Sequence, residues 1–241
     1  MAPLDAFSRA LVIAGAVLAL VGVIRAGCAP VGGSQRGLLT VAGALTLGGI
    51  LRAGATPFSP AVGLAWVALA TAAATLYIRP VRRAAYRLGG IAIVVAAGAL
   101  ALLPRSTPPY LYAPGLWPAV GRIGLALAAG TLLAGIFSRS ADNAGSRLLS
   151  SAWCLQTVGL LGHGVGARQL WGAYWSRDPL ECWLLAAWLV TAIAAWGERA
   201  WGWGERRPYA LVIAPAIVAL FVLFGALPLL HVLGTSSLFL R

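Results

Sequence analysis

Long apolar stretches alternate with short polar connections along the whole chain. The stretches cover residues 8–25, 37–53, 60–78, 88–104, 117–137, 148–167, 181–197 and 209–230. None alternates apolar and polar residues at every second position, as a barrel strand does. Because a helix needs roughly 20 apolar residues to cross a bilayer, the pattern predicts an all-α polytopic membrane helix bundle with about eight transmembrane helices. We expect residues 1–241 to form a single integral membrane domain.

The composition excludes an ordinary soluble domain. Hydrophobic residues make up 60% of the chain and charged residues only 10%, whereas soluble domains carry about 25% charged residues. The first apolar stretch lacks the basic residues and the small-residue cleavage site of a secretory signal. We therefore expect it to be retained as the first span.

The arginines predict the orientation. All 18 basic residues are arginines, and they separate the apolar stretches instead of forming a basic face, which argues against nucleic-acid binding. Eleven of the 18 lie in or beside the connections after the first, third, fifth and seventh stretches. By the positive-inside rule, both termini and the connection between stretches six and seven then lie outside. We expect a multi-pass protein of the cytoplasmic (inner) membrane, with this connection facing the outside or periplasm.

Cysteine and histidine are few. The three cysteines show neither CxxC nor CxxCH spacing, so the chain is not itself a c-type cytochrome. They fit small buried apolar residues, and a disulfide stays an alternative. The two histidines are His163 and His231.

Residues 171–183, WGAYWSRDPLECW, interrupt this apolar pattern with aromatic and charged side chains. An aromatic belt at the membrane interface is one interpretation. However, Asp178 and Glu181 are two of only six acidic residues, and charge at membrane depth is costly unless it is paired. Pro179 is expected to begin a helix, with Asp178 as its N-cap and Glu181 in its first turn. The aromatic side chains before it, Trp171, Tyr174 and Trp175, could form an apolar platform.

This segment resembles the tryptophan-rich haem-handling motif of the cytochrome c assembly superfamily. The form in the system II integral synthase subunit is WGxYWxWDPKETW, and it matches here at Trp171, Gly172, Tyr174, Trp175, Asp178, Pro179, Glu181 and Trp183. Further along, GALPLLHVLG is similar to the family segment that presents a histidine to external haem, which makes His231 a candidate axial ligand. On these residues the chain is identified as a divergent member of the superfamily.

The resemblance implies a function. It implies that an outer loop, residues 168–180, holds haem of b type for attachment to apocytochrome c, as part of a holocytochrome c synthase. The implied partners are membrane lipids, other membrane subunits of cytochrome c assembly and apocytochrome c. No catalytic side chain is assigned, because the attachment depends on reduced iron and oriented thiols.

The chain departs from the family pattern at several positions. Arg177 replaces the central tryptophan and Cys182 the usual threonine. The external histidine expected before the motif is absent, with Gly121 and Arg122 near its place, and a transmembrane histidine expected after the motif would fall near Trp196. Two histidines cannot supply ligands for an internal and an external haem.

The roles of His163, Arg177 and Arg122 stay open at this point. His163 either forms a hydrogen bond between helices or ligates haem together with His231. Arg177 pairs with a haem propionate, with Asp178 or Glu181, or with lipid phosphate. Arg122, as an intramembrane charge, could neutralise Glu181 or a propionate.

These departures support a second functional hypothesis. The chain would then be a divergent accessory or structural subunit of a respiratory or photosynthetic electron-transfer complex that has lost haem transport. A transporter has weaker support, because no broken-helix pair or internal duplication is evident.

Overall fold

The computed structural model describes residues 6–28, 31–52, 60–77, 83–102, 116–137, 144–175 and 178–201, followed by residues 209–232. The regular elements among the described residues are all helices, which confirms the all-α prediction. They are α1 (Ala6–Cys28), α2 (Gly33–Arg52), α3 (Pro60–Tyr77), α4 (Arg83–Leu102), α5 (Leu116–Phe137), α6 (Ala144–Trp171), α7 (Pro179–Trp201), α8 (Tyr209–Phe224) and α9 (Ala226–Val232).

The helices have the length and composition of a membrane bundle. Among the described residues, four segments are long and apolar enough to cross a bilayer: Phe7–Ala26, Arg83–Leu100, Leu116–Ile136 and Pro179–Gly197. Ala61–Tyr77 and Ile213–Phe224 are apolar but shorter. The remaining long helices, α2 and α6, are more polar, since α6 carries Gln156 and His163 within its length. The protein is therefore a membrane helix bundle.

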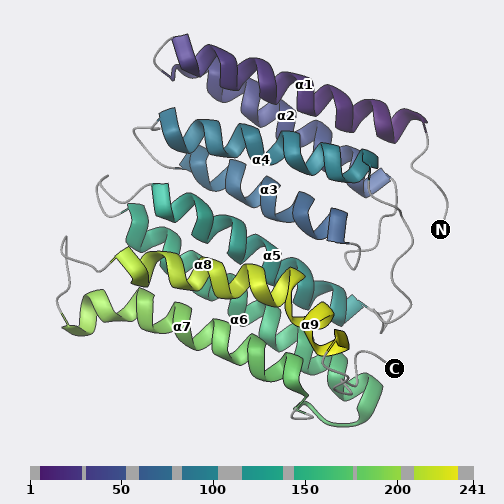
Figure 1. Cartoon of the computed structure of the whole chain (residues 1–241), viewed down its shortest axis with the longest axis vertical. Helices are drawn as coiled ribbons and strands as arrows, with labels where there is room; N and C mark the ends of the chain where they lie inside the picture. The colour runs from purple at the N-terminus through teal and green to yellow at the C-terminus, as the bar shows by residue number, and fades with distance from the viewer. Residues whose placement is uncertain are drawn as a thin grey trace.

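The long helices lie side by side, and consecutive helices run in opposite directions (Figure 1). Two apolar clusters lie among α1 to α4, and a third joins α5 to α8 and includes Val67 of α3 and Ala226 of α9. The seam between α3 and α5 connects the two groups. There the Thr71 hydroxyl of α3 donates to the Gly130 carbonyl of α5 at 3.2 Å. A side chain at Gly130 would collide with the Val67 carbonyl, so the glycine lets the two helices approach closely.

The eighth apolar stretch, predicted as one segment over 209–230, forms two helices. α8 ends at Phe224, and α9 begins at Ala226 after Gly225 and turns away from the axis of α8 (Figure 1). Pro228 has no amide hydrogen and cannot donate to the carbonyl of Phe224, four residues earlier, so the continuous helix is interrupted.

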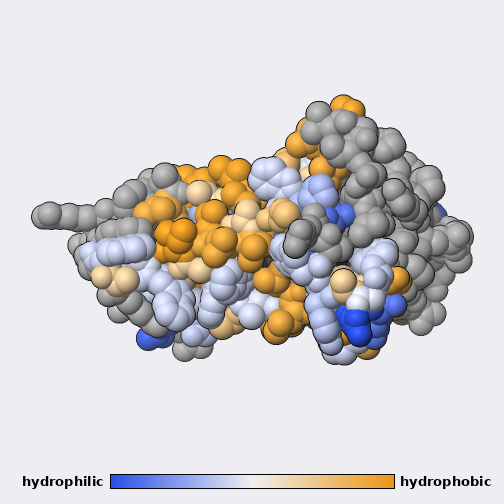
Figure 2. Space-filling model, turned by 90° about the horizontal axis from the view of Figure 1, so that it is seen from below, coloured by the Kyte–Doolittle hydropathy of each residue, from blue (hydrophilic) through white to orange (hydrophobic). Residues whose placement is uncertain are grey.

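The start of α1, the end of α9 and the connection between α6 and α7 lie at the same end of the bundle, although α1 is far from the other two across it (Figure 1). The described chain therefore begins and ends at the same end of the bundle. The arginine pattern predicts that both termini lie on one side of the membrane. Which side of the membrane this end faces stays a prediction. In Figure 2, the face formed by the later helices has apolar residues along its middle and its most hydrophilic residues towards its ends, as expected for helices whose middles face lipid.

Candidate functional site

A glycine turn ends α6 and directs the chain towards α7. Gly172 has a φ of 79°, in the left-handed region that favours glycine, and its amide donates to the Arg168 carbonyl at 3.0 Å. The Arg168 guanidinium donates back to the Gly172 carbonyl and lies 5.7 Å from the centroid of the Tyr174 ring. These contacts fix the turn and leave Tyr174 and Trp175 exposed at its surface.

The start of α7 is capped as the sequence predicts. The Asp178 carboxylate accepts the Leu180 amide at 2.8 Å, and its carbonyl accepts the Cys182 amide at 3.1 Å. Pro179 is the first helical residue and Glu181 lies in the first turn. Both carboxylates are buried, with 4% of Asp178 and 1% of Glu181 exposed. Capping explains why an aspartate lies at position 178. It does not explain why the Glu181 carboxylate is buried.

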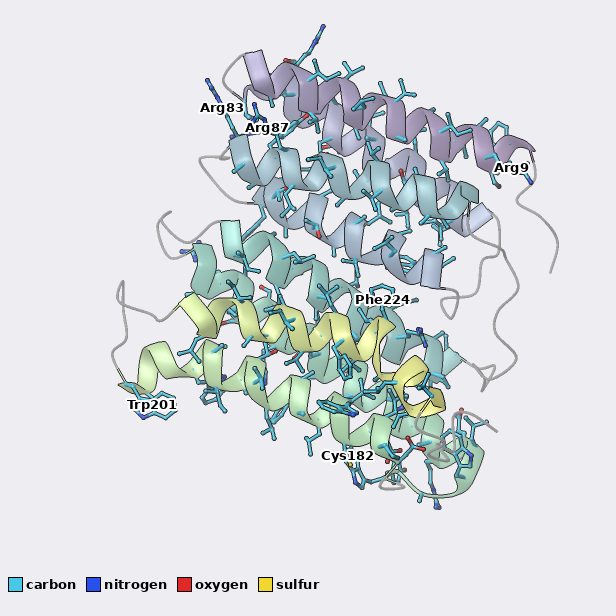
Figure 3. The ribbon with its side chains drawn as sticks, viewed as in Figure 1. Arg9, Arg83, Arg87, Cys182, Trp201 and Phe224 are labelled. Carbon is cyan, nitrogen blue, oxygen red and sulfur yellow. The ribbon has the colours of Figure 1, made fainter. Side chains whose placement is uncertain are left out.

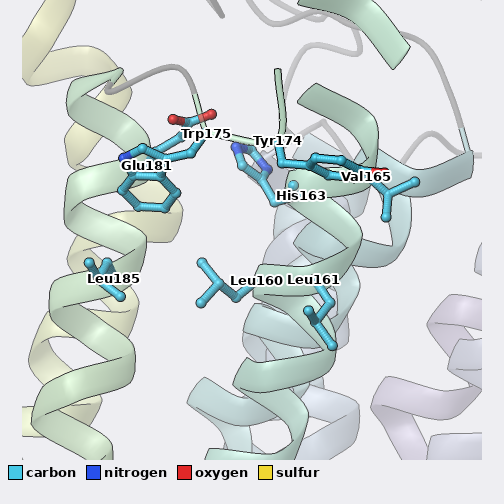
Figure 4. A pocket seen from close by; sticks show the side chains of 9 residues that line it. Leu160, Leu161, His163, Val165, Tyr174, Trp175, Glu181 and Leu185 are labelled. Carbon is cyan, nitrogen blue, oxygen red and sulfur yellow. The ribbon is translucent and has the colours of Figure 1, made fainter. Parts of the chain in front are cut away.

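A cavity of about 460 Å³ lies between the end of α6 and the start of α7. Its lining is apolar apart from an imidazole and a carboxylate: Leu160, Leu161, His163, Gly164, Val165, Tyr174, Trp175, Glu181 and Leu185. His163, Tyr174, Trp175 and Glu181 lie together at one end of it, and the leucines lie at the other (Figure 4). The volume falls in the range of about 300–1,000 Å³ that is typical of small-molecule sites.

The cavity brings together only part of the predicted residue set. Trp171, Gly172, Asp178 and Trp183 belong to the surrounding structure and do not line it. Trp183 instead packs edge-on against Phe221 of α8, with ring centroids 4.9 Å apart. Arg177 and the side chain of His231 lie outside the described residues. Within the described part of the chain, no group of three or more His, Cys, Asp or Glu residues could hold a metal ion.

Glycines allow α5 to lie directly behind His163. A Cβ placed on Gly121 would lie 3.1 Å from the His163 amide nitrogen and 3.3 Å from its Cβ. A Cβ on Gly124 would lie 2.9 Å from the Gly159 backbone. The two backbones touch along this seam, and the seam sets where the imidazole stands relative to α5.

Arg122 links this region to the break between α8 and α9. One of its Nη atoms donates to the Leu223 carbonyl at 3.3 Å, at the last turn of α8. Its charge and that of Asp178 both act on the His163 imidazole, with opposite signs. Arg122, Asp178 and His163 therefore form one electrostatic group beside the cavity, contributed by α5, the α7 cap and α6.

The apolar part of the lining was not predicted from the sequence. Leu160, Gly164 and Val165 lie within one helical turn of His163, and Leu185 follows Glu181 by four residues. Helical spacing could have identified Leu160, three residues before His163, and Leu185, four residues after Glu181, because residues three or four apart share a face, but it does not identify Gly164 or Val165. A local contact favours a residue without a side chain at position 164, because a Cβ there would approach the Tyr174 carbonyl to 3.3 Å.

A second aromatic cluster lies deeper between α6 and α7. The ring of Trp153 lies 5.5 Å from that of Trp188 and 5.6 Å from that of Trp196, centroid to centroid. The Trp188 indole nitrogen donates to the Thr157 hydroxyl at 2.9 Å. The Trp153 indole thus packs against the half-exposed ring of Trp196, near which the family pattern predicts a histidine.

Comparison with known proteins identifies relatives of part of the chain. No protein-family model matches it. The cytochrome c biogenesis protein CcsA of Nostoc punctiforme is 37% identical over 89 residues, which cover 37% of this chain and 25% of that protein. The CcsA protein of Synechococcus sp. (strain CC9311) is 37% identical over 91 residues, covering 38% of this chain and 30% of that protein. About 90 residues of the chain are therefore similar to part of proteins named for cytochrome c biogenesis. The match spans only about a quarter to a third of the length of these relatives.

Proposed function

We propose that this membrane protein acts in cytochrome c biogenesis and holds haem at the outer membrane face for attachment to apocytochrome c. The observation that carries the proposal is the cavity between α6 and α7, with an imidazole among apolar and aromatic walls. The partial similarity to proteins named for cytochrome c biogenesis supports the same function. The residues 168–180 form the haem-handling loop in this proposal.

The side chains present fit a haem group. Haem is a flat apolar ring, and the leucines, Tyr174 and Trp175 offer an apolar surface of suitable chemistry. When bound, haem would supply an iron that accepts imidazole and vinyl groups that react with thiols. His163 faces the cavity and is the axial ligand we assign, with His231 as the second candidate.

The polar groups around the cavity would orient the ligand. Arg168 already stands at the loop surface, and Arg177 follows in the same loop, so their guanidinium groups are suited to bind the two propionates. Asp178 fixes the start of α7, which carries Glu181 and Leu185 into the cavity wall. Arg122 and Asp178 act on His163 with opposite charges.

Absorption spectroscopy of the protein purified from its native membrane tests the proposal. We expect a Soret band and a pyridine haemochrome spectrum of b type. His163→Ala should lose most of the bound haem, and added imidazole should restore the band. Purified protein without haem, or a band unchanged in His163→Ala, would overturn the assignment.

A matched pair of variants tests the location of the ligand. Leu185 lines the cavity, whereas Leu189, one turn further along α7, is exposed outside it. We expect Leu185→Trp to fill the cavity and reduce haem content, while Leu189→Trp retains it. Equal haem content in the two variants would place the ligand elsewhere.

A second candidate function is that of an accessory subunit of a respiratory or photosynthetic electron-transfer complex. Trp196 favours it, because an indole packed on Trp153 lies near the position where the family pattern predicts a histidine for an inner haem. Copurification distinguishes the two functions. Stable association with a multisubunit electron-transfer complex supports the accessory role, and association with cytochrome c assembly subunits supports the first.

A further inference from the structure

We propose that the adjoining ends of α1, α2 and α4 form a binding site for the phosphate group of an anionic phospholipid. The site lies at the opposite end of the bundle from the cavity. Figure 3 shows Arg83 and Arg87 at this end and Arg9 at the other.

Two hydrogen bonds bring the three helix ends together. The Tyr86 hydroxyl of α4 donates to the Gln35 carbonyl in the first turn of α2, at 2.5 Å. A guanidinium nitrogen of Arg87 donates to the Ala26 carbonyl near the end of α1, at 3.5 Å. The first turn of α4 therefore lies against the last turns of α1 and the start of α2.

This arrangement gathers positive charge without compensation from the same helices. Arg25 precedes Ala26, Arg36 follows Gln35, and Arg83 lies one turn before Arg87. The sequences of α1, α2 and α4 contain no aspartate or glutamate. Four arginines thus belong to the three helix ends that these hydrogen bonds hold together, and none of these helices carries a carboxylate, so an external anion is the natural counter-charge.

The surroundings of Arg36 point to a ligand at the same place. Its Nε atom is buried and has no hydrogen-bond partner among the described residues. Beside it, Gly33 and Gly37 have open space, since a Cβ on either would meet no atom within 4 Å. The site therefore offers an unused buried donor next to room for a headgroup.

The chemistry of the membrane identifies the class of ligand. Basic pockets at the ends of transmembrane helices bind anionic headgroups, and the cytoplasmic leaflet is rich in such lipids. This end carries the arginine-rich connections and is the predicted inner side. A phosphate group accepts several charge-assisted hydrogen bonds from guanidinium groups at once.

Native mass spectrometry of the detergent-purified full chain tests the site with phosphatidylglycerol and phosphatidylcholine as probes. We expect preferential retention of phosphatidylglycerol. The double variant Arg36→Gln, Arg83→Gln should weaken that binding about 30-fold, from two removed surface charges. Arg9→Gln at the opposite end is the matched control and should bind as the wild type does.

Two further measurements make the result decisive. The double variant must keep the wild-type thermal midpoint in phosphatidylcholine, which shows that its fold is intact. If that midpoint falls, the single variant Arg83→Gln, whose side chain is exposed, replaces the double variant.

Stabilisation by phosphatidylglycerol but not by glycerol phosphate identifies a lipid as the ligand. Equal stabilisation by both identifies a soluble phosphate as the source. Equal binding of the two lipids, or equal binding by the tested variant and Arg9→Gln, would overturn the proposal.

Discussion

The contact between α5 and α6 allows a sharp test of how the candidate site is positioned. Gly124 faces Gly159 across this contact, and a Cβ on Gly124 would lie 2.9 Å from the Gly159 amide nitrogen and Cα. Carbon atoms in contact prefer separations of about 3.5–4.0 Å. Gly124→Ala therefore forces the two backbones apart by about 0.6–1 Å, because no flexible side chain can move out of the way.

The cost of Gly124→Ala follows from two opposing effects. Overpacking of this kind costs about 1–3 kcal/mol, and replacing a helical glycine by alanine returns about 0.5–1 kcal/mol. The net loss is about 1–2 kcal/mol, which lowers the unfolding midpoint of a chain of this size by about 2–8 °C. The measurement is thermal unfolding in detergent, followed by tryptophan fluorescence.

Gly98→Ala is the matched control for the same substitution. A Cβ on Gly98 in α4 would meet no atom within 4 Å. Only the helix-propensity gain then applies, so its unfolding midpoint should equal or exceed that of the wild type. If Gly124→Ala is as stable as Gly98→Ala, the close backbone contact between α5 and α6 is wrong, and so is the position it gives to His163.

Three other predictions concern the cap, the inner aromatic cluster and the orientation. Asp178→Ala should destabilise the protein by about 1 kcal/mol through loss of the N-cap, with Asp178→Asn close to wild type, and equal losses in chemical unfolding would argue against capping. Trp188→Phe and Thr157→Ala should show a coupling energy of about 0.6 kcal/mol in a double-mutant cycle, and strict additivity would mean that their hydrogen bond contributes nothing. In a chain otherwise free of cysteine, Ala173→Cys should react with a membrane-impermeant maleimide on intact cells and Ala84→Cys only after lysis; the reverse pattern would invert the predicted topology.

Features that depend on local sequence were predictable. The helices follow from apolar length, and the start of α7 follows from Asp178, Pro179 and Glu181, whose roles depend on neighbouring residues alone. The break at Gly225 was missed, although Pro228 carries the signal, because the apolar stretch continues across it. An apolar stretch indicates which residues are buried, but it does not indicate whether they form one continuous helix.

Features that depend on helix packing were not predictable. Trp183 belongs to the aromatic motif, yet its ring packs on Phe221 of α8, some forty residues later in the chain. The leucine wall of the cavity likewise comes from two helices, α6 and α7, and the glycine contacts with α5 lie along α6 alone. A single sequence gives the face of each helix but not the partner that each face meets.

The glycine at position 121 gives a physical reason for one departure from the family pattern. The resemblance places an external histidine near this position on α5, yet a side chain at Gly121 would press on the backbone and Cβ of His163 on α6. With α5 and α6 this close, a side chain at Gly121 would require the neighbouring atoms of α6 to give way by a few tenths of an ångström. In our proposal the imidazole therefore comes from α6, and Gly121 is the consequence of that choice. An imidazole missing from α5 is then no argument against a ligand at the cavity, whereas a tryptophan near the position of the family's transmembrane histidine, packed on Trp153, does argue against a second haem there.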